Sequence, residues 1–135
     1  MALVKTNIDE AIARVDEWKG KKVTYTPVAG GITNPNFKVN VDGTNFFLKI
    51  PGAGTDFIDR DNCHAANEIA SESGAGPKVY YYFKDTGVEI FQWLEGYRQV
   101  TFGDVYYQDI CLKIAETAAA FHNDPHKLPL TQSIF

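Results

Sequence analysis

The sequence contains few of the residues that would indicate a disulfide-bonded, zinc-binding or membrane protein. Its 135 residues include 2 cysteines and 3 histidines, and none of them has the close, paired spacing of zinc ligands. No apolar run approaches the roughly 20 residues of a membrane span, and the N-terminus lacks the apolar segment of a signal peptide. We therefore expect Cys63 and Cys111 to be reduced thiols of a cytoplasmic protein.

Positive charge is also scarce. The chain has 13 lysines and arginines against 17 aspartates and glutamates, which gives a formal net charge of -4. This balance argues against a nucleic-acid partner held by bulk electrostatics. The hydrophobic share of 44% is that of a globular protein, and the length suits a single domain with a modest core.

A glycine-rich loop, residues 29–37, lies between two strand-like runs. Gly30 and Gly31 remove the Cβ atoms that would keep the backbone away from a ligand, and successive N–H groups in such a loop can bind an anion. Lys49 follows on the next strand but one and could reach the same anion. These features favour a phosphate cradle of the strand–loop–strand kind. Taken alone, the loop favours an ordinary hairpin turn, because Gly and Asn-Pro are common turn residues.

The hydrophobic pattern predicts an α+β fold with about five antiparallel strands. Helices are expected at residues 6–20, 56–73 and 104–122, and strands at 23–28, 37–41, 45–50, 78–83 and 88–94. Thr6 with Asp9, and Thr101 with Asp104, resemble capping boxes at the first and last helix starts. The strand at 45–50 places Phe46, Leu48 and Ile50 on one face and Phe47 and Lys49 on the other.

Two of the expected helices carry apolar stripes. The stripes are Ile8, Ala11, Ile12, Val15 and Trp18 in the first helix, and Tyr107, Cys111, Ile114, Ala118 and Phe121 in the last. The second stripe has no obvious partner in this chain. Exposed apolar patches promote association, so we expect a homodimer through the 104–122 helix or an exchange of that helix between copies.

Six motifs then occur in a characteristic order. They are Gly-Gly-Ile-Thr-Asn at 30–34, Phe-Leu-Lys-Ile-Pro-Gly-Ala-Gly-Thr at 47–55, Phe-Ile-Asp-Arg at 57–60, Ala-Gly-Pro-Lys-Val-Tyr at 75–80, Val-Glu-Ile-Phe-Gln-Trp-Leu at 88–94 and Ala-Ala-Ala-Phe-His at 118–122. The ordered set resembles the N-terminal lobe of the protein-kinase-like superfamily. It is most similar to bacterial choline kinases and their choline/ethanolamine kinase relatives, over nearly the whole chain.

The resemblance implies a phosphotransferase that moves the γ-phosphoryl of ATP to the hydroxyl of a small amino-alcohol, with Mg²⁺ as cofactor. It implies that the triphosphate is covered by Gly30, Gly31, Ile32, Thr33 and Asn34. Lys49 would pair with the phosphates and offset their charge, whereas a lysine that only extends to water is the structural alternative. The Gln92 carbonyl and the Leu94 N–H would bind adenine.

One departure from the family lies in the helix after Lys49. Kinases hold this lysine with a helix glutamate, and the family's glutamate falls at Cys63 in this sequence. Glu68 is about 140° round the helix from Cys63 and cannot simply substitute. Asp59 and Asn67 lie one turn either side of Cys63. The candidate partners of Lys49 remain Asp59, if the helix extends to it, and Glu68, although Glu68 lies on another face of the helix.

A second departure is that the family's His-Gly-Asp-type catalytic loop and its metal-binding Asp motif do not occur. We therefore assign no catalytic residue and no metal ligand, and the chain's status as an enzyme stays open. The expected division is a nucleotide-binding lobe at 1–98, then a linker and the first helix of a missing C-terminal lobe at 99–135. We expect this lobe to be inactive by itself and to bind the amino-alcohol only together with the missing C-terminal lobe. The alternative is a free-standing, non-catalytic module for a nucleotide or a protein partner.

Overall fold

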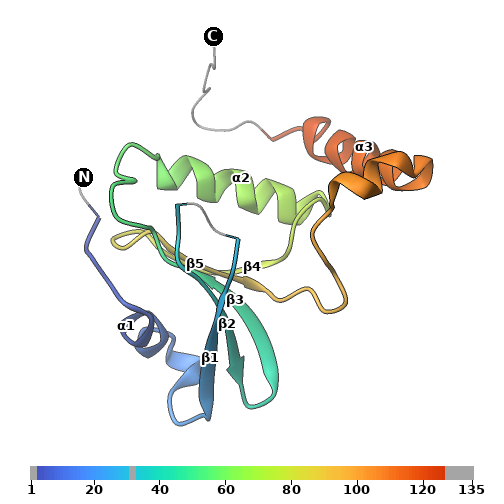
Figure 1. Ribbon diagram of the computed structural model, residues 1–135. Helices are drawn as coiled ribbons and strands as arrows, with labels where there is room; N and C mark the ends of the chain where they lie inside the picture. Colours follow the sequence, from blue (N-terminus) through green and yellow to red (C-terminus); the bar gives the residue numbers. More distant parts are fainter. Residues whose placement is uncertain (1–2, 31–32, 127–135) are drawn as a thin grey trace.

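The computed structural model describes residues 3–30 and 33–126, which form a five-stranded antiparallel sheet with helices on both faces (Figure 1). The strands are β1 (Val23–Val28), β2 (Asn36–Val41), β3 (Thr44–Lys49), β4 (Val79–Phe83) and β5 (Val88–Gln92). Their order in the sheet is β1-β2-β3-β5-β4. The α-helices are α1 (Ile8–Ala13), α2 (Arg60–Glu72) and α3 (Gln108–His122), and two short 3₁₀ helices are η1 (Asp16–Trp18) and η2 (Phe102–Tyr106).

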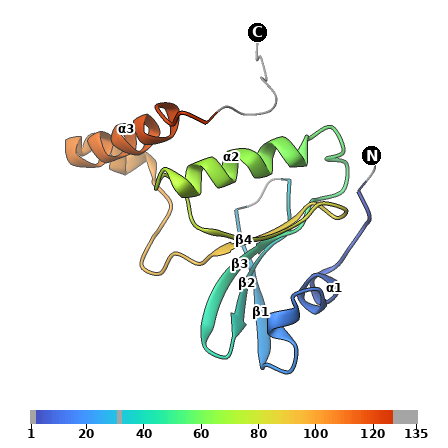
Figure 2. The ribbon, with the colours of Figure 1, turned by 180° about the vertical axis from the view of Figure 1, so that it is seen from behind.

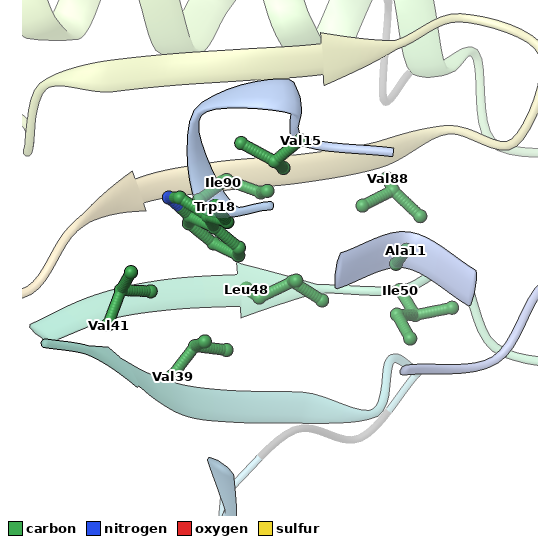
Figure 3. Packing of buried hydrophobic residues seen from close by; sticks show 9 residues of the cluster. All are labelled: Ala11, Val15, Trp18, Val39, Val41, Leu48, Ile50, Val88 and Ile90. Atoms are coloured by element: carbon green, nitrogen blue, oxygen red, sulfur yellow. The ribbon is translucent and has the colours of Figure 1, made fainter. Parts of the chain in front are cut away.

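The hydrophobic core lies between the N-terminal segment and one face of the sheet (Figure 3). Its buried members are Ala11, Val15, Trp18, Val39, Val41, Leu48, Ile50, Val88 and Ile90. Leu48 and Ile50 are therefore on the face that the alternation predicted. Because side chains alternate along a strand, Lys49 and its register partner Glu89 point to the opposite face, which α2 covers (Figures 1 and 2).

The predicted single helix at 6–20 is wrong. α1 ends at Ala13, and η1 follows after an extended Val15. The capping box is also one residue later than expected, with Asn7 as the N-cap and Glu10 as its partner. The helix ends where the Arg14 guanidinium turns to the Asp85 carboxylate in the β4–β5 turn, with N–O distances of 3.0 and 2.8 Å. Hydrophobic spacing does not encode this distant contact.

Two other helices begin later than the sequence predicted. α2 starts at Arg60 because Asp59 is its N-cap, with the Asp59 carboxylate accepting a hydrogen bond from the Asn62 N–H at 2.9 Å. The Thr101–Asp104 capping box is present, but it begins η2, and the extended Tyr107 separates η2 from α3. Within the described residues, no helix has the length and apolarity that a membrane crossing needs.

Candidate functional site

The centre of the candidate site is an ion pair between two neighbouring strands. Lys49 at the end of β3 is the register partner of Glu89 on β5, and Lys49 Nζ lies 2.5 Å from Glu89 Oε2. The Glu89 side chain is 3% exposed and that of Lys49 is 20% exposed. A buried carboxylate is costly unless its charge is paired and its oxygens are hydrogen-bonded. Lys49 therefore stabilises Glu89, while its own side chain stays partly exposed.

Helix α2 supplies the remaining hydrogen bonds of this carboxylate. The Asn67 amide donates to both Glu89 oxygens, at 2.9 and 3.1 Å. His64 Nδ1 lies 3.2 Å from Glu89 Oε1. Each Glu89 oxygen thus has at least two polar partners, and a fully satisfied buried network of this kind holds its members rigidly.

A second layer of contacts fixes the His64 ring. Tyr82 on β4 stacks on it, with the ring centroids 4.1 Å apart and the planes at 21°. The Tyr82 hydroxyl donates to Asp61 at 2.7 Å. Burial, then the hydrogen bond to Asp61, raises the pKa of Tyr82. Lys84, followed by Tyr82, lowers the pKa of Asp61. Tyr82 thus stays protonated as a donor, and His64 is held between a ring and a carboxylate.

The structure pairs Lys49 with Glu89 and not with either candidate from the sequence. Asp59 caps α2 with its carboxylate. Glu68 is 57% exposed and lies 3.5 Å from His64 Nε2, on the far side of that ring from Glu89. Cys63, where the resemblance to the family places a glutamate, is half-buried and has a thiol instead of a carboxylate.

The glycine-rich loop is anchored beside this pair. The Pro35 carbonyl accepts a hydrogen bond from the Ile50 N–H at 3.0 Å, next to Lys49. Asn34 accepts one from the Gly52 N–H at 3.3 Å through its side-chain oxygen. Gly30 is exposed with a φ of +106°, a conformation that favours glycine. Gly31 and Ile32, also expected at the phosphates, lie outside the described residues.

The segment expected to bind adenine is the end of β5. The Gln92 N–H donates to the Lys78 carbonyl at 2.8 Å, which fixes the strand end. Leu94 is half-buried, two residues beyond β5. Between them, Trp93 lies 6.5 Å from Phe47, centroid to centroid, and Lys38 Nζ is 4.6 Å from its ring centroid. These aromatic rings share the face of the sheet that carries Lys49.

Asn36 adds an unpaired acceptor on this face. It is the register partner of Lys49 on β2, and Asn36 Oδ1 is buried without a hydrogen-bond donor among the described residues. A buried acceptor left unpaired costs about 1–3 kcal/mol. Such an atom beside the lysine is a natural point for a donor group of a ligand.

The described residues bring no three acidic, histidine or cysteine side chains together as a metal site. They therefore do not fit a resident Mg²⁺ ion by themselves. We assign no step to such an ion within the part of the chain that the structure describes.

Sequence reasoning missed Glu89 and His64 as members of the site. A signal for Glu89 existed: it is the one charged residue inside the apolar run 88–91, and a charge there requires a partner. Asn67 was placed on the correct helix face but without a role. No comparable signal marked His64.

Comparison with known proteins agrees with this architecture. A family model described as choline/ethanolamine kinase matches residues 25–133. A probable ethanolamine kinase B of Dictyostelium discoideum is 30% identical over 115 residues, which are 81% of this chain. The chain spans only 25% of that relative's length.

Two solved structures share the fold. A choline/ethanolamine kinase family protein from Mesorhizobium loti superposes with a TM-score of 0.75 at 23% identity, over 93% of this chain and 41% of that one. An ethanolamine kinase from Plasmodium vivax gives a TM-score of 0.63 at 20% identity, over 90% of this chain and 31% of that one. The predicted kinase-like N-terminal lobe is therefore confirmed, and the chain belongs to the choline/ethanolamine kinase family.

Proposed function

We propose that residues 1–98 are the ATP-binding lobe of a phosphotransferase that acts on a small amino-alcohol. The observation that carries this proposal is Lys49, whose ammonium is paired with the buried Glu89 at 2.5 Å and lies beside the anchored glycine-rich loop. A fixed cation next to backbone N–H groups is the arrangement that stabilises transferring phosphoryl groups.

Each part of the site then has a role. The backbone of Gly30 to Asn34 covers the triphosphate, and Lys49 neutralises part of its charge. The Gln92 carbonyl and the Leu94 N–H bind adenine, and the neighbouring Trp93 and Phe47 rings border the base.

The rest of the reaction belongs to a second lobe. We assign residues 99–135 to the linker and the first helix of that lobe, which would bring the catalytic acid and base groups, the Mg²⁺ ligands and the amino-alcohol site. Alone, the 135-residue chain should bind ATP weakly and transfer no phosphoryl group. As part of this proposal, the protein acts in the cytoplasm, where ATP is available.

Nucleotide titration followed by NMR tests the binding role. Millimolar MgATP should shift amide signals of residues 30, 33, 34, 49 and 92–94, and Lys49→Ala should weaken the affinity about tenfold, because it removes a charge-assisted contact. Lys19→Ala is the matched control, since Lys19 pairs with Asp16 at 2.5 Å on the exposed N-terminal segment. Saturable binding that survives Lys49→Ala unchanged would show that the phosphates lie elsewhere.

The same titration distinguishes the alternative, a free-standing module for a protein partner. Such a module needs no nucleotide, so the absence of any shift at millimolar ATP would favour it. A phosphoryl-transfer assay with ATP and ethanolamine or choline should give no product with this chain alone. Product formation would contradict the assignment of catalysis to a second lobe.

A further inference from the structure

The lysine of the candidate site takes its counter-charge from the sheet, whereas no carboxylate of α2 contacts it among the described residues. We propose that Glu89 on β5 is the positioning residue that orients Lys49 toward the phosphates of ATP. The inference rests on the proposed function and adds to it the residue through which the lysine is held.

The register of the sheet makes this contact direct. Lys49 and Glu89 are facing residues of the antiparallel β3–β5 pair, so the backbone brings their Cβ atoms to one face at short range. The Glu89 side chain is 3% exposed. A carboxylate at this depth has little access to water, and its interaction with the ammonium is correspondingly strong.

Asn67 and His64 fix the orientation of the carboxylate itself. Asn67 bridges both oxygens, at 2.9 and 3.1 Å, and His64 contacts Oε1 at 3.2 Å. Oε2 is therefore turned toward Lys49. A lysine side chain is long and flexible, so a rigidly held acceptor is needed to limit its ammonium to one position.

Helix α2 has no competing carboxylate in this position. The Asp59 carboxylate is used as the helix cap, and Glu68 is 57% exposed on the other side of His64. Cys63 is one turn before Asn67 and shares its helix face. A carboxylate at 63 would therefore approach the same lysine from the helix.

A double-mutant cycle on the 135-residue chain tests the proposal, with the MgATP dissociation constant from NMR titration as the readout. Lys49→Ala and Glu89→Gln should each weaken binding about five- to tenfold. In the Lys49→Ala background, Glu89→Gln should have less than about a twofold effect, because a positioning residue acts only through its lysine. A purely structural role predicts the same loss in both backgrounds, and that result would overturn the proposal.

Relocating the charge gives an independent test. Cys63→Glu added to Glu89→Gln should recover most of the lost affinity, because it returns a carboxylate to Lys49 from α2. Glu72→Gln is the matched control, a helix carboxylate that is 65% exposed, and it should leave binding unchanged. Absence of recovery in a folded double variant counts against the proposal.

Two outcomes separate this inference from the proposed function on which it rests. No ATP binding by the unmodified chain overturns both. Loss of binding in Lys49→Ala but none in Glu89→Gln overturns only the role of Glu89. If Glu89→Gln does not fold, Glu89→Asp replaces it: the charge is retained but withdrawn by one methylene, so affinity should fall several-fold, and unchanged affinity overturns the proposal.

Discussion

Thr33 of the glycine-rich loop lies directly on Gly52 in the turn after β3. A Cβ atom on Gly52 would stand 1.9 Å from the Thr33 carbonyl oxygen and 2.9 Å from its carbonyl carbon. Only glycine fits at this distance, because the atoms that block it belong to the backbone and not to a flexible side chain. The end of the loop at Thr33 and Asn34 is therefore held against the turn that follows Lys49.

Gly52→Ala should displace the glycine-rich loop. The added methyl group forces the backbone at Thr33 to move and breaks the 3.3 Å hydrogen bond from the Gly52 N–H to Asn34. We expect a loss of about 1–3 kcal/mol in unfolding free energy and a weaker response to MgATP. Urea denaturation and NMR titration measure the two effects. Gly103→Ala is the control, since the nearest atom to its Cβ would be 3.8 Å away, and it should change neither quantity.

Leu48→Ala should destabilise the lobe without touching the polar face. Leu48 is fully buried against the N-terminal segment, one residue before Lys49 but on the opposite side of the sheet. Large-to-small changes of this kind cost about 2–5 kcal/mol. Denaturation followed by tryptophan fluorescence, to which Trp18 in the same core contributes, gives the value. Leu112→Ala on α3, where the side chain is 58% exposed, should stay within about 0.5 kcal/mol of the unmodified chain.

The strands and their faces could be predicted from the sequence because the relevant signal is local. Alternation along 45–50 correctly separated the buried Leu48 from Lys49. The predicted helix ends were wrong because they depend on contacts between residues far apart in the sequence. α1 ends where Arg14 meets Asp85, and these residues are 71 positions apart. The break at Tyr107 falls on the first residue of the apolar stripe expected for the last helix, so periodicity alone does not detect it.

The partner of Lys49 could not be predicted from the helix because strand order decides it. In the sheet, β5 lies between β3 and β4, and this crossover brings Glu89 beside Lys49. The family pattern directed attention to α2, where Cys63 replaces the expected glutamate. A buried charge inside the run 88–91 was the only local indication of the alternative.

Asp104→Asn should weaken η2 in a pH-dependent way. The Arg98 guanidinium contacts both Asp104 oxygens at 2.6 and 2.7 Å. This contact, followed by the hydrogen bonds from the Thr101 N–H and hydroxyl, holds the pKa of Asp104 well below its ordinary 3.8. A lowered carboxyl pKa stabilises the folded form above the ordinary value, and the contribution is lost as the pH falls through the lowered one.

Amide exchange across η2 measures this effect. At pH 7, the η2 amides of the Asp104→Asn variant should exchange faster than those of the unmodified chain. This difference should shrink as the pH falls below about 3.8. Salt should also reduce it, because the Arg98 side chain is 65% exposed. Asp109→Asn, an exposed residue in the first turn of α3, is the control. If the difference in exchange rate did not depend on pH, its cause would be packing and not the ion pair.

The apolar stripe of α3 should drive association between copies of the chain. Tyr107, which directly precedes α3, and Ile114 within it are 61% and 44% exposed, and in the described part of the chain α3 has no buried residue. Exposed apolar faces of this kind gain stability by pairing. Sedimentation should show mass increasing with concentration, and Tyr107→Ser with Ile114→Ser should return the chain to a monomer. Lys113→Ser alters the exposed polar side of the same helix at a similar cost in helix propensity, so it should leave the association intact. A monomer at every micromolar concentration of the unmodified chain would mean that α3 does not pair with itself.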